Sequence, residues 1–161
     1  MLSVLRRARV SLGQIVVLAA SLAISACVPG AGPGPAAGKG SGSVQVALLV
    51  PAGSGQSSDE VLAKSLQNAA RLAIADLGGV KIDLRVYNTA GSPAQAAAQA
   101  QKAVAEGAQV ILGPVFAQEA NAAGVAVAAS GVNVLSFSNN TDIAGNNVFV
   151  LGPTFDNTAK R

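Results

Sequence analysis

The sequence contains no histidine and no tryptophan, and its single cysteine is Cys27. The absence of histidine removes the commonest general base and metal ligand of proteins. One cysteine excludes a disulfide within the chain. Aromatic residues make up 3% of the sequence and charged residues 12%. Because the groups that usually carry out catalysis are scarce, we expect a protein that is not an enzyme and that needs no cofactor.

The positive charge of the chain is concentrated near its start. The formal net charge is +3, from 11 basic and 8 acidic residues, and three of the basic residues are Arg6, Arg7 and Arg9. The rest of the chain then has 11 − 3 = 8 basic residues against 8 acidic ones. A neutral remainder with few aromatic residues lacks the basic stripe of nucleic-acid-binding proteins. We therefore expect no nucleic-acid partner.

The first part of the chain has the pattern of an export signal. The arginines precede an apolar stretch at residues 10–26, which ends in small residues just before Cys27. The sequence Ile-Ser-Ala-Cys at positions 24–27 resembles the lipobox of bacterial lipoproteins, in which the cysteine is lipidated and becomes the mature N-terminus. This resemblance implies a signal peptide at residues 1–26 and a lipidation site at Cys27. The protein is then expected in the periplasm, anchored by its lipid to the cell membrane or the outer membrane.

Two other interpretations of this stretch are weaker. An uncleaved membrane anchor needs about 20 apolar residues, whereas residues 10–26 are 17 residues and include Ser11, Gln14 and Ser21. A free cysteine can also pack in a core as a small apolar residue. Neither interpretation explains why the arginines, the apolar stretch and the small residues occur together.

A linker follows the cysteine. Residues 28–43 contain six glycines and three prolines, a composition that cannot form a core. We therefore expect residues 27–43 to be a lipidated cysteine followed by a flexible tether.

Residues 44–161 alternate between short apolar runs and helical patterns. Strands are expected at residues 44–50, 82–87, 110–112, 132–137 and 148–151, and helices at residues 59–77, 93–106 and 118–130. Strand–helix–strand alternation predicts parallel strands joined by crossover helices. The expected fold class is α/β, with a doubly wound, mainly parallel sheet flanked by helices.

The first expected helix shows an amphipathic pattern. Asp59 is expected to cap its start. An apolar stripe at helical spacing is expected to face the sheet, and its members are Leu62, Leu66, Ala69, Ala73 and Leu77.

Ligand sites in doubly wound sheets lie at the carboxyl ends of the strands. The loops expected there cover residues 51–58, 88–92, 113–118 and 136–141, and they are rich in Ser, Thr, Asn and Gly. Hydroxyl groups and free N–H groups at helix starts suit a carboxylate or a neutral polar ligand. Turns need the same residue types, so the composition is explained equally well by turn geometry.

The apolar run with its glycine-rich turn at residues 44–55, the sequence VILGPVF at residues 110–116 and the Gly152-Pro153 pair together resemble the type I periplasmic binding proteins. More narrowly, they are similar to the branched-chain amino-acid-binding group and to penicillin-binding protein activator lipoproteins. The resemblance covers residues 44–161 and implies a two-lobed fold that closes on a small ligand. Members of the family are longer, so we expect residues 44–161 to be the first lobe, truncated at the first crossover to the second.

The resemblance also implies ligand-binding positions. The family places a serine after the third strand, where this sequence has Ala117, followed by Gln118 as a substitute. After the fourth strand the family offers backbone groups and a hydroxyl, and the matching candidates here are Ser136, Ser138, Asn139 and Asn140.

Two functions follow as expectations. The first is a solute-binding lipoprotein of an amino-acid ABC importer, which binds a small polar ligand such as an amino acid and delivers it to a permease. The alternative is a lipoprotein similar to penicillin-binding protein activators, which binds such a synthase and stimulates peptidoglycan synthesis. An enzyme built on the same kind of sheet is a third and much weaker interpretation, because catalytic groups are scarce.

Overall fold

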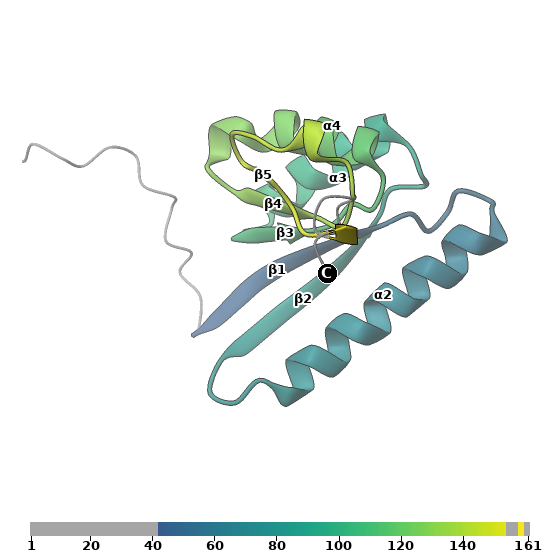
Figure 1. Ribbon diagram of the computed structural model, residues 1–161. Helices are drawn as coiled ribbons and strands as arrows, with labels where there is room; N and C mark the ends of the chain where they lie inside the picture. The colour runs from purple at the N-terminus through teal and green to yellow at the C-terminus, as the bar shows by residue number, and fades with distance from the viewer. Residues whose placement is uncertain (1–41, 154–157, 160–161) are drawn as a thin grey trace, which may run out of the picture. The chain divides into compact units, whose positions relative to one another are not determined.

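The computed structural model describes residues 42–153 and 158–159 (Figure 1). The predicted signal peptide, Cys27 and nearly all of the linker lie outside these residues. In chain order the elements are β1 (Ser43–Val50), α2 (Ser57–Asp76), β2 (Lys81–Asn88), α3 (Pro93–Ala105), β3 (Val110–Leu112), α4 (Ala117–Val127), the 3-10 helix η1 (Ala128–Ser130), β4 (Asn133–Ser136), the 3-10 helix η2 (Thr141–Ile143) and β5 (Val148–Val150). Each predicted strand and helix is therefore present, although the third helix is an α-helix only as far as Val127.

The strands form one sheet in the order β2-β1-β3-β4-β5, and every neighbouring pair is parallel. From β1 the chain first moves to β2 at one edge and then returns past β1 to β3, β4 and β5. The direction of winding therefore changes between β1 and β3. The predicted doubly wound parallel sheet is confirmed.

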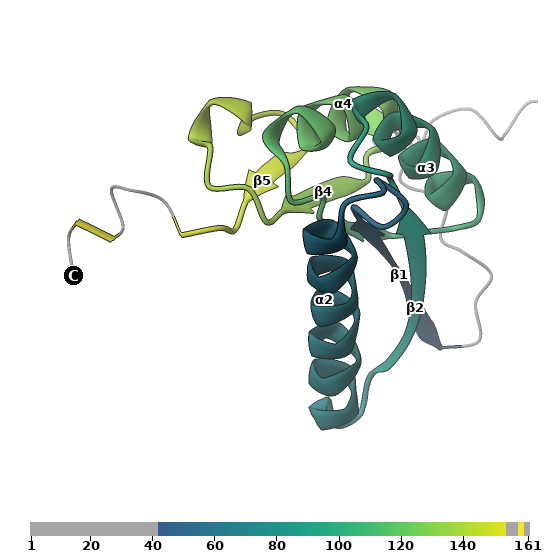
Figure 2. The ribbon, with the colours of Figure 1, turned by 90° about the vertical axis from the view of Figure 1, so that its right-hand side faces the viewer.

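Helices lie on both faces of the sheet, α2 on one side and α3 with α4 on the other (Figure 2). The side chains of β1 alternate between these two layers, as a strand buried on both faces requires. Ala47 and Leu49 pack in the layer of α3 and α4. Leu48 and Val50 pack in the layer of α2, with Ala63 and Leu66.

The layer of α3 and α4 is built from alanine. Ala96, Ala100 and Ala103 of α3 and Ala120 and Ala123 of α4 have no exposed surface. Small side chains let the two helices approach each other and the sheet closely. The alanine-rich pattern thus produces a tightly packed layer rather than a loosely covered one.

The start of α2 differs from the prediction. Gln56 is the N-cap residue and makes no side-chain capping bond, whereas Asp59 is the third residue of the helix and is buried. The predicted cap at Asp59 is wrong because the helix begins earlier, at Ser57.

The predicted stripe of α2 is wrong in part. The residues that pack against the sheet are Ala63, Leu66 and Ala70, whereas Ala69 and Ala73 are exposed. Leu77, also exposed, lies just beyond the end of the helix. Alanine occurs on several sides of this helix, so the pattern of apolar residues does not mark its inner face.

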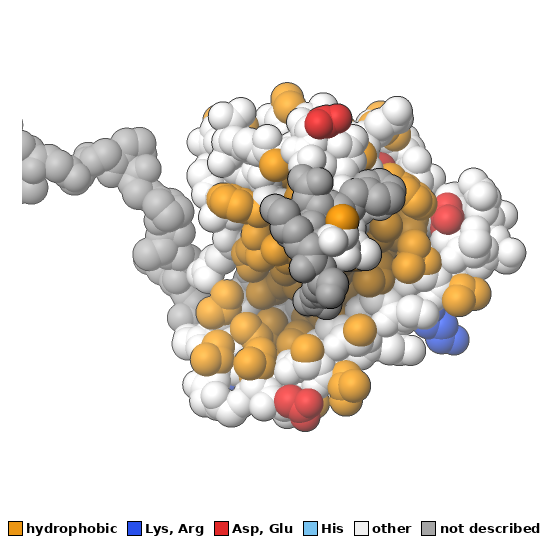
Figure 3. Space-filling view, in the orientation of Figure 1, with side chains coloured by type: hydrophobic (Ala, Val, Ile, Leu, Met, Phe, Trp, Pro, Cys, Tyr) orange, Lys and Arg blue, Asp and Glu red, His pale blue; other side chains and the backbone are white. Residues whose placement is uncertain are grey.

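The face of the sheet next to α2 becomes more exposed toward β5. The strand register aligns Leu48, Leu112, Leu135 and Phe149 in one row across four strands. Leu48, beside α2, is 1% exposed, whereas Phe149, at the far edge, is 48% exposed. Figure 3 shows hydrophobic side chains gathered on this face. In the described residues, α2 covers β1 and β2 but does not reach β5.

Candidate functional site

Loops from four strands meet at the carboxyl edge of the sheet, because every strand is parallel to its neighbours. They are the β1–α2 loop (residues 51–56), the β2–α3 loop (residues 89–92), the β3–α4 loop (residues 113–116) and the β4–η2 loop (residues 137–140). We call this edge the rim. Binding sites of doubly wound sheets lie at this edge, near the change in winding direction.

The β3–α4 and β4–η2 loops are fastened to each other. The amide of Phe137 donates to the carbonyl of Pro114 at 3.0 Å, and the hydroxyl of Ser136 donates to the same carbonyl at 3.0 Å. Gly113 has a φ of +81°, and a Cβ at this position would overlap the carbonyl oxygen of Leu49. Only glycine therefore fits where β3 leaves the sheet, and the two loops form a single rigid part of the rim.

The two predicted serines support the loop from inside. Ser136 has no exposed surface, and its hydroxyl, besides donating to Pro114, accepts a bond from the amide of Ser138 at 3.1 Å. Ser138 is 4% exposed, and its hydroxyl accepts a bond from the amide of Asn140 at 3.1 Å. Direct ligand contact by these two hydroxyls stays a prediction.

The two predicted asparagines lie at the surface of the rim. Asn139 and Asn140 are both exposed. The side-chain oxygen of Asn140 accepts a bond from the amide of Asp142 at 2.9 Å and so caps η2. Its side-chain NH₂ group faces no acceptor that the structure describes, so Asn140 can still donate to a ligand.

The start of α4 provides the other predicted positions. Ala117 is half-buried and Gln118 is exposed. The N-cap residue, Phe116, makes no side-chain capping bond and is 39% exposed. A helix start without a side-chain cap presents N–H groups and the positive end of the helix dipole, which suit a carboxylate.

Sequence reasoning missed three buried polar residues beneath the rim. Thr89 has no exposed surface, Glu119 is 1% exposed and Asp59 is 8% exposed. The sequence predicts Asp59 only as a helix cap, and it does not predict that Thr89 and Glu119 are buried. An acid in the first turn of a helix that follows a buried strand is the signal that marks such residues in a sequence.

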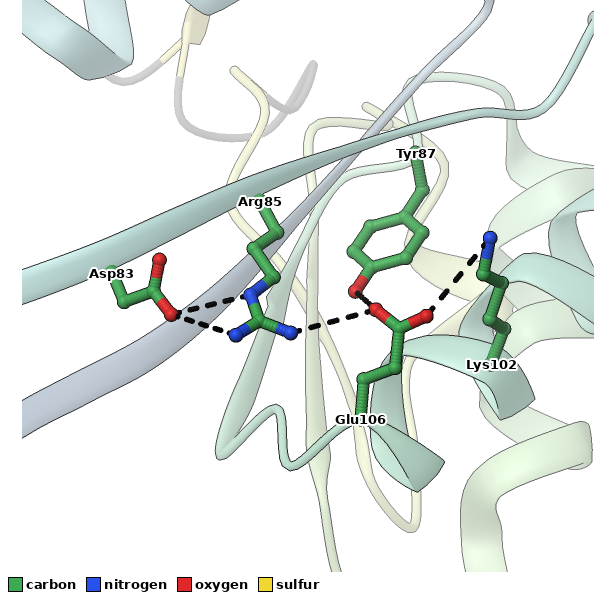
Figure 4. Close-up of polar contacts among 5 residues, drawn as sticks. All are labelled: Asp83, Arg85, Tyr87, Lys102 and Glu106. Atoms are coloured by element: carbon green, nitrogen blue, oxygen red, sulfur yellow. Dashed lines mark hydrogen bonds and ion pairs between the residues drawn. The ribbon is translucent and has the colours of Figure 1, made fainter. Parts of the chain in front are cut away.

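A second polar cluster joins the edge strand β2 to the end of α3 (Figure 4). The guanidinium of Arg85 lies 3.1 Å from the carboxylate of Asp83 and 3.6 Å from that of Glu106. The carboxylate of Glu106 also accepts a hydrogen bond from the hydroxyl of Tyr87 at 2.7 Å and forms an ion pair with Lys102 at 3.9 Å. All the polar groups in this cluster bond to one another, so we assign it a structural role.

A third feature is an open hollow of about 440 Å³ beside the first half of α2. Ala52, Val61 and Ala63 form its apolar part, and Glu60, Lys64 and Gln67 its polar part. The amide of Gly53 already donates to Glu60 at 2.6 Å. Glu60 is thus already bonded, and because the hollow is open we do not assign a ligand to it.

Within residues 42–153 and 158–159, no helix has both the length and the apolar character that a membrane crossing requires. The same residues contain no group of three or more acidic, histidine or cysteine side chains placed to hold a metal ion.

Residues 43–161 match the family model of the periplasmic binding proteins. The chain therefore belongs to the periplasmic binding protein family, and the predicted resemblance is confirmed. No curated protein matches the chain.

Solved structures show the same fold. A leucine-binding protein from Thermotoga maritima is 22% identical and has a TM-score of 0.56, with 65% of this chain and 31% of that chain covered. An ABC-transporter solute-binding protein from Rhodopseudomonas palustris, in complex with 3,4-dihydroxybenzoic acid, is 24% identical with a TM-score of 0.58, and the coverage is 67% and 31%. A branched-chain amino-acid transporter substrate-binding protein from Streptococcus pneumoniae, in complex with isoleucine, is 17% identical with a TM-score of 0.58, and the coverage is 67% and 33%. The chain spans about a third of the length of these structures.

Proposed function

We propose that this protein is a lipid-anchored, non-enzymatic solute-binding component of an ABC importer for amino acids or similar small carboxylates. The observation that carries the proposal is the rim, where the uncapped start of α4 lies at the same edge as the exposed amides of the β4–η2 loop. Membership of the periplasmic binding protein family supports it.

The ligand groups follow from the exposed positions of the rim. The first-turn N–H groups of α4, at Ala117 and Gln118, bind the ligand carboxylate, because the positive end of the helix dipole is directed there. The side chains of Gln118, Asn139 and Asn140 add neutral hydrogen bonds. The other two predicted residues, Ser136 and Ser138, hold the β4–η2 loop in position through their hydroxyl groups.

Phe116 supports a ligand that has an apolar part. It is the N-cap residue of α4 and is 39% exposed. An exposed ring beside a carboxylate-binding helix start suits a ligand with an aliphatic or aromatic side chain. The ligands named in the structures of similar fold, isoleucine and 3,4-dihydroxybenzoic acid, both combine a carboxylate with an apolar part.

The proposed organisation has three parts. Residues 1–26 are a signal peptide, residues 27–43 are a tether that starts at lipidated Cys27, and residues 44–161 are the N-terminal lobe of the binding protein. This places the lobe in the periplasm, where an importer permease is its partner. The exposed end of the row from Leu48 to Phe149 supports the idea that further structure packs against this lobe.

Calorimetry with the full chain and a panel of amino acids and aromatic carboxylates tests the proposal. We expect saturable heat with at least one of them. Gln118→Ala and Asn140→Ala should each weaken binding about fivefold to tenfold, as expected for the loss of one hydrogen bond. Gln101→Ala, an exposed amide of α3 outside the rim, is the matched control and should leave binding unchanged. The absence of saturable heat across the panel would contradict the proposal.

A penicillin-binding protein activator is the second candidate. Ala117 favours it, because this position has no hydroxyl for an amino-acid ligand and the hydroxyls of Ser136 and Ser138 already bond within the loop. An activator should increase the rate at which a purified peptidoglycan synthase makes glycan, and it should do so without any amino acid. Stimulation of this kind, together with no heat in the calorimeter, would favour the activator over the importer component.

A further inference from the structure

Glu119 is the most unusual polar residue of the described chain. Its side chain is 1% exposed, and neither carboxyl oxygen has a hydrogen-bond partner. A buried carboxylate without a partner is costly, and proteins usually neutralise such a group or provide it with a counter-charge. Glu119 is therefore expected either to be protonated or to lie near a positive charge.

Thr89 lies beside Glu119, but its hydroxyl is already engaged as a donor. The hydroxyl of Thr89 donates to the carbonyl of Val50 at 3.1 Å, so its one proton is already used. The lone pairs of this hydroxyl oxygen remain free to accept a bond. A protonated Glu119 can donate to this oxygen, whereas an ionised Glu119 has to compete with the carbonyl of Val50 for the hydroxyl proton.

Asp59 lies on the other side of the same turn. The turn is fixed by two bonds to the β1–α2 side of the rim, from the amide of Thr89 to Val50 at 2.9 Å and from the amide of Ala90 to Ala52 at 3.1 Å. A methyl group on Gly91 would lie 3.7 Å from Oδ2 of Asp59. Two buried carboxyl groups, one from α2 and one from α4, thus flank the turn at residues 89–91.

Basic side chains do not balance this pair. The ion pairs described in the structure join Arg85 and Lys102 to Asp83 and Glu106, in the cluster of Figure 4. The turn at residues 89–92 and the loop at residues 113–116 contain no titratable side chain. Among the helices packed against α4, α3 and η2 carry charged residues, which are Lys102, with Glu106 directly after α3, and Asp142. Helix α2 carries Glu60, Lys64, Arg71 and Asp76 besides Asp59.

The effect on ionisation has a clear direction. Burial raises the pKa of Glu119 above its ordinary value of 4.5, and the Asp59 carboxylate adds to the rise, while Thr89 and the backbone of Phe116 act the other way. A like charge in the surroundings disfavours the ionised form of a buried carboxyl group.

We propose that Asp59 and Glu119 form a proton-binding carboxyl pair that holds the starts of α2 and α4 together beneath the rim. With one proton bound, Glu119 is neutral and donates to the hydroxyl oxygen of Thr89. Loss of this proton leaves two buried carboxylates on either side of one turn, and their repulsion loosens the β1–α2 and β3–α4 loops. The pair is distinct from the ligand groups of the proposed function, and its test needs no ligand.

The sign of the pH dependence follows from the raised pKa. A carboxyl group whose pKa is higher in the folded than in the unfolded protein stabilises the fold at low pH, and this stability is lost as the pH rises through the folded pKa. We therefore expect the unfolding constant of the full chain to increase as the pH rises above 4.5, with a slope of up to about tenfold per pH unit for one proton.

Urea unfolding of the full chain over this pH range provides the test. Glu119→Gln should remove the slope, because the amide cannot titrate. Asp76→Asn removes an acid at the other end of α2 and should retain the slope. A wild-type protein without a slope, or a Glu119→Gln variant with the wild-type slope, would overturn the proposal.

Carboxyl-carbon NMR of the wild-type protein gives a direct measurement that does not require the variant to fold. Glu119 should titrate above the other glutamates, and Asp59→Asn should lower its midpoint. A midpoint of Glu119 in the ordinary range would refute the proton pair. Unfolding at high pH is also compared in sodium and in calcium at matched ionic strength. If either cation stabilises the wild-type protein and Glu119→Gln abolishes this effect, a cation and not a proton neutralises the pair, which would overturn the proposal.

Discussion

The hydroxyl of Tyr87 donates to the carboxylate of Glu106 at 2.7 Å and so joins the edge strand β2 to the end of α3. Arg85, two residues earlier on β2, reaches the same carboxylate at 3.6 Å. The edge strand is therefore bonded to the helix that covers its face as well as to β1.

Burial and this bond make Tyr87 resistant to ionisation. Burial, together with Glu106, raises the pKa of Tyr87 to about 12 from its ordinary value of 10.0. Because the protein has one tyrosine and no tryptophan, the ultraviolet absorbance of tyrosinate reports on this residue alone. We expect a midpoint about two pH units above that of the urea-unfolded chain. The stability linked to Tyr87 is complete below the unfolded pKa and is lost as the pH rises through the folded one. A midpoint equal to that of the unfolded chain would show that the bond does not form in solution.

Tyr87→Phe should lower the free energy of unfolding by about 1 kcal/mol, the usual net contribution of one hydrogen bond. Denaturant unfolding at neutral pH measures this loss. The partner, Glu106, keeps Arg85 and Lys102 as neighbours, so it is not left as an unpaired charge. A loss of several kcal/mol would mean that the ring itself is no longer packed.

Leu66→Asp and Ala69→Asp form a matched pair on α2. Leu66 packs against the sheet, so a charge there should lower the free energy of unfolding by about 2 to 4 kcal/mol. Ala69 is exposed, and a charge there should change it by no more than about 0.5 kcal/mol. Thermal unfolding of both variants decides between the inner face described here and the stripe predicted from the sequence. Equal losses would support the predicted stripe.

Gly124→Ala should destabilise the protein even though alanine favours a helix. A Cβ at this position of α4 would overlap Cγ2 of Val148 on β5. Overpacking costs about 1 to 3 kcal/mol, which exceeds the gain of about 1 kcal/mol in helix propensity. Gly78→Ala is the control, because a Cβ there meets nothing within 4 Å. Chemical unfolding of the two variants should show a loss only for Gly124→Ala, and a more stable Gly124→Ala protein would show that the α4–β5 contact is looser than described.

Cys27→Ser should block lipidation and cause the unprocessed precursor to accumulate. Labelled palmitate fed to cells that express either form measures the modification, and immunoblots show the size of the product. Ser25→Ala keeps a small residue before the cysteine and should be lipidated normally. Uptake of palmitate by Cys27→Ser protein would mean that the anchor is attached elsewhere.

The centre of the sheet could be predicted because β1 and β3 are almost wholly apolar. A run such as residues 44–50 has no polar side to mislead the assignment, and glycines mark the helix ends. The inner face of α2 could not be predicted, since alanine on several sides gives Ala63 and Ala69 the same hydrophobicity. Only the position of the helix over β1 and β2 separates them.

The positions of the rim were also predictable, because the carboxyl ends of parallel strands meet at one edge. Whether each side chain of the rim is buried or exposed could not be predicted. Ser136 and Asn140 look alike as polar loop residues, yet the first is completely buried and the second is exposed. The pairing of Asp59 with Glu119 depends on two helices that are far apart in the sequence and on opposite faces of the sheet.

The alanines between α3 and α4 have an effect on the thermodynamics of folding. A buried leucine or methionine gives up rotamer freedom when it packs, whereas alanine has none to lose. Ala96, Ala100, Ala103, Ala120 and Ala123 therefore become ordered without a side-chain entropy penalty, although each removes little apolar area from water. This layer should thus be held mainly by short-range dispersion forces between closely spaced backbones, and its contribution to the heat capacity change of unfolding should be small for its size.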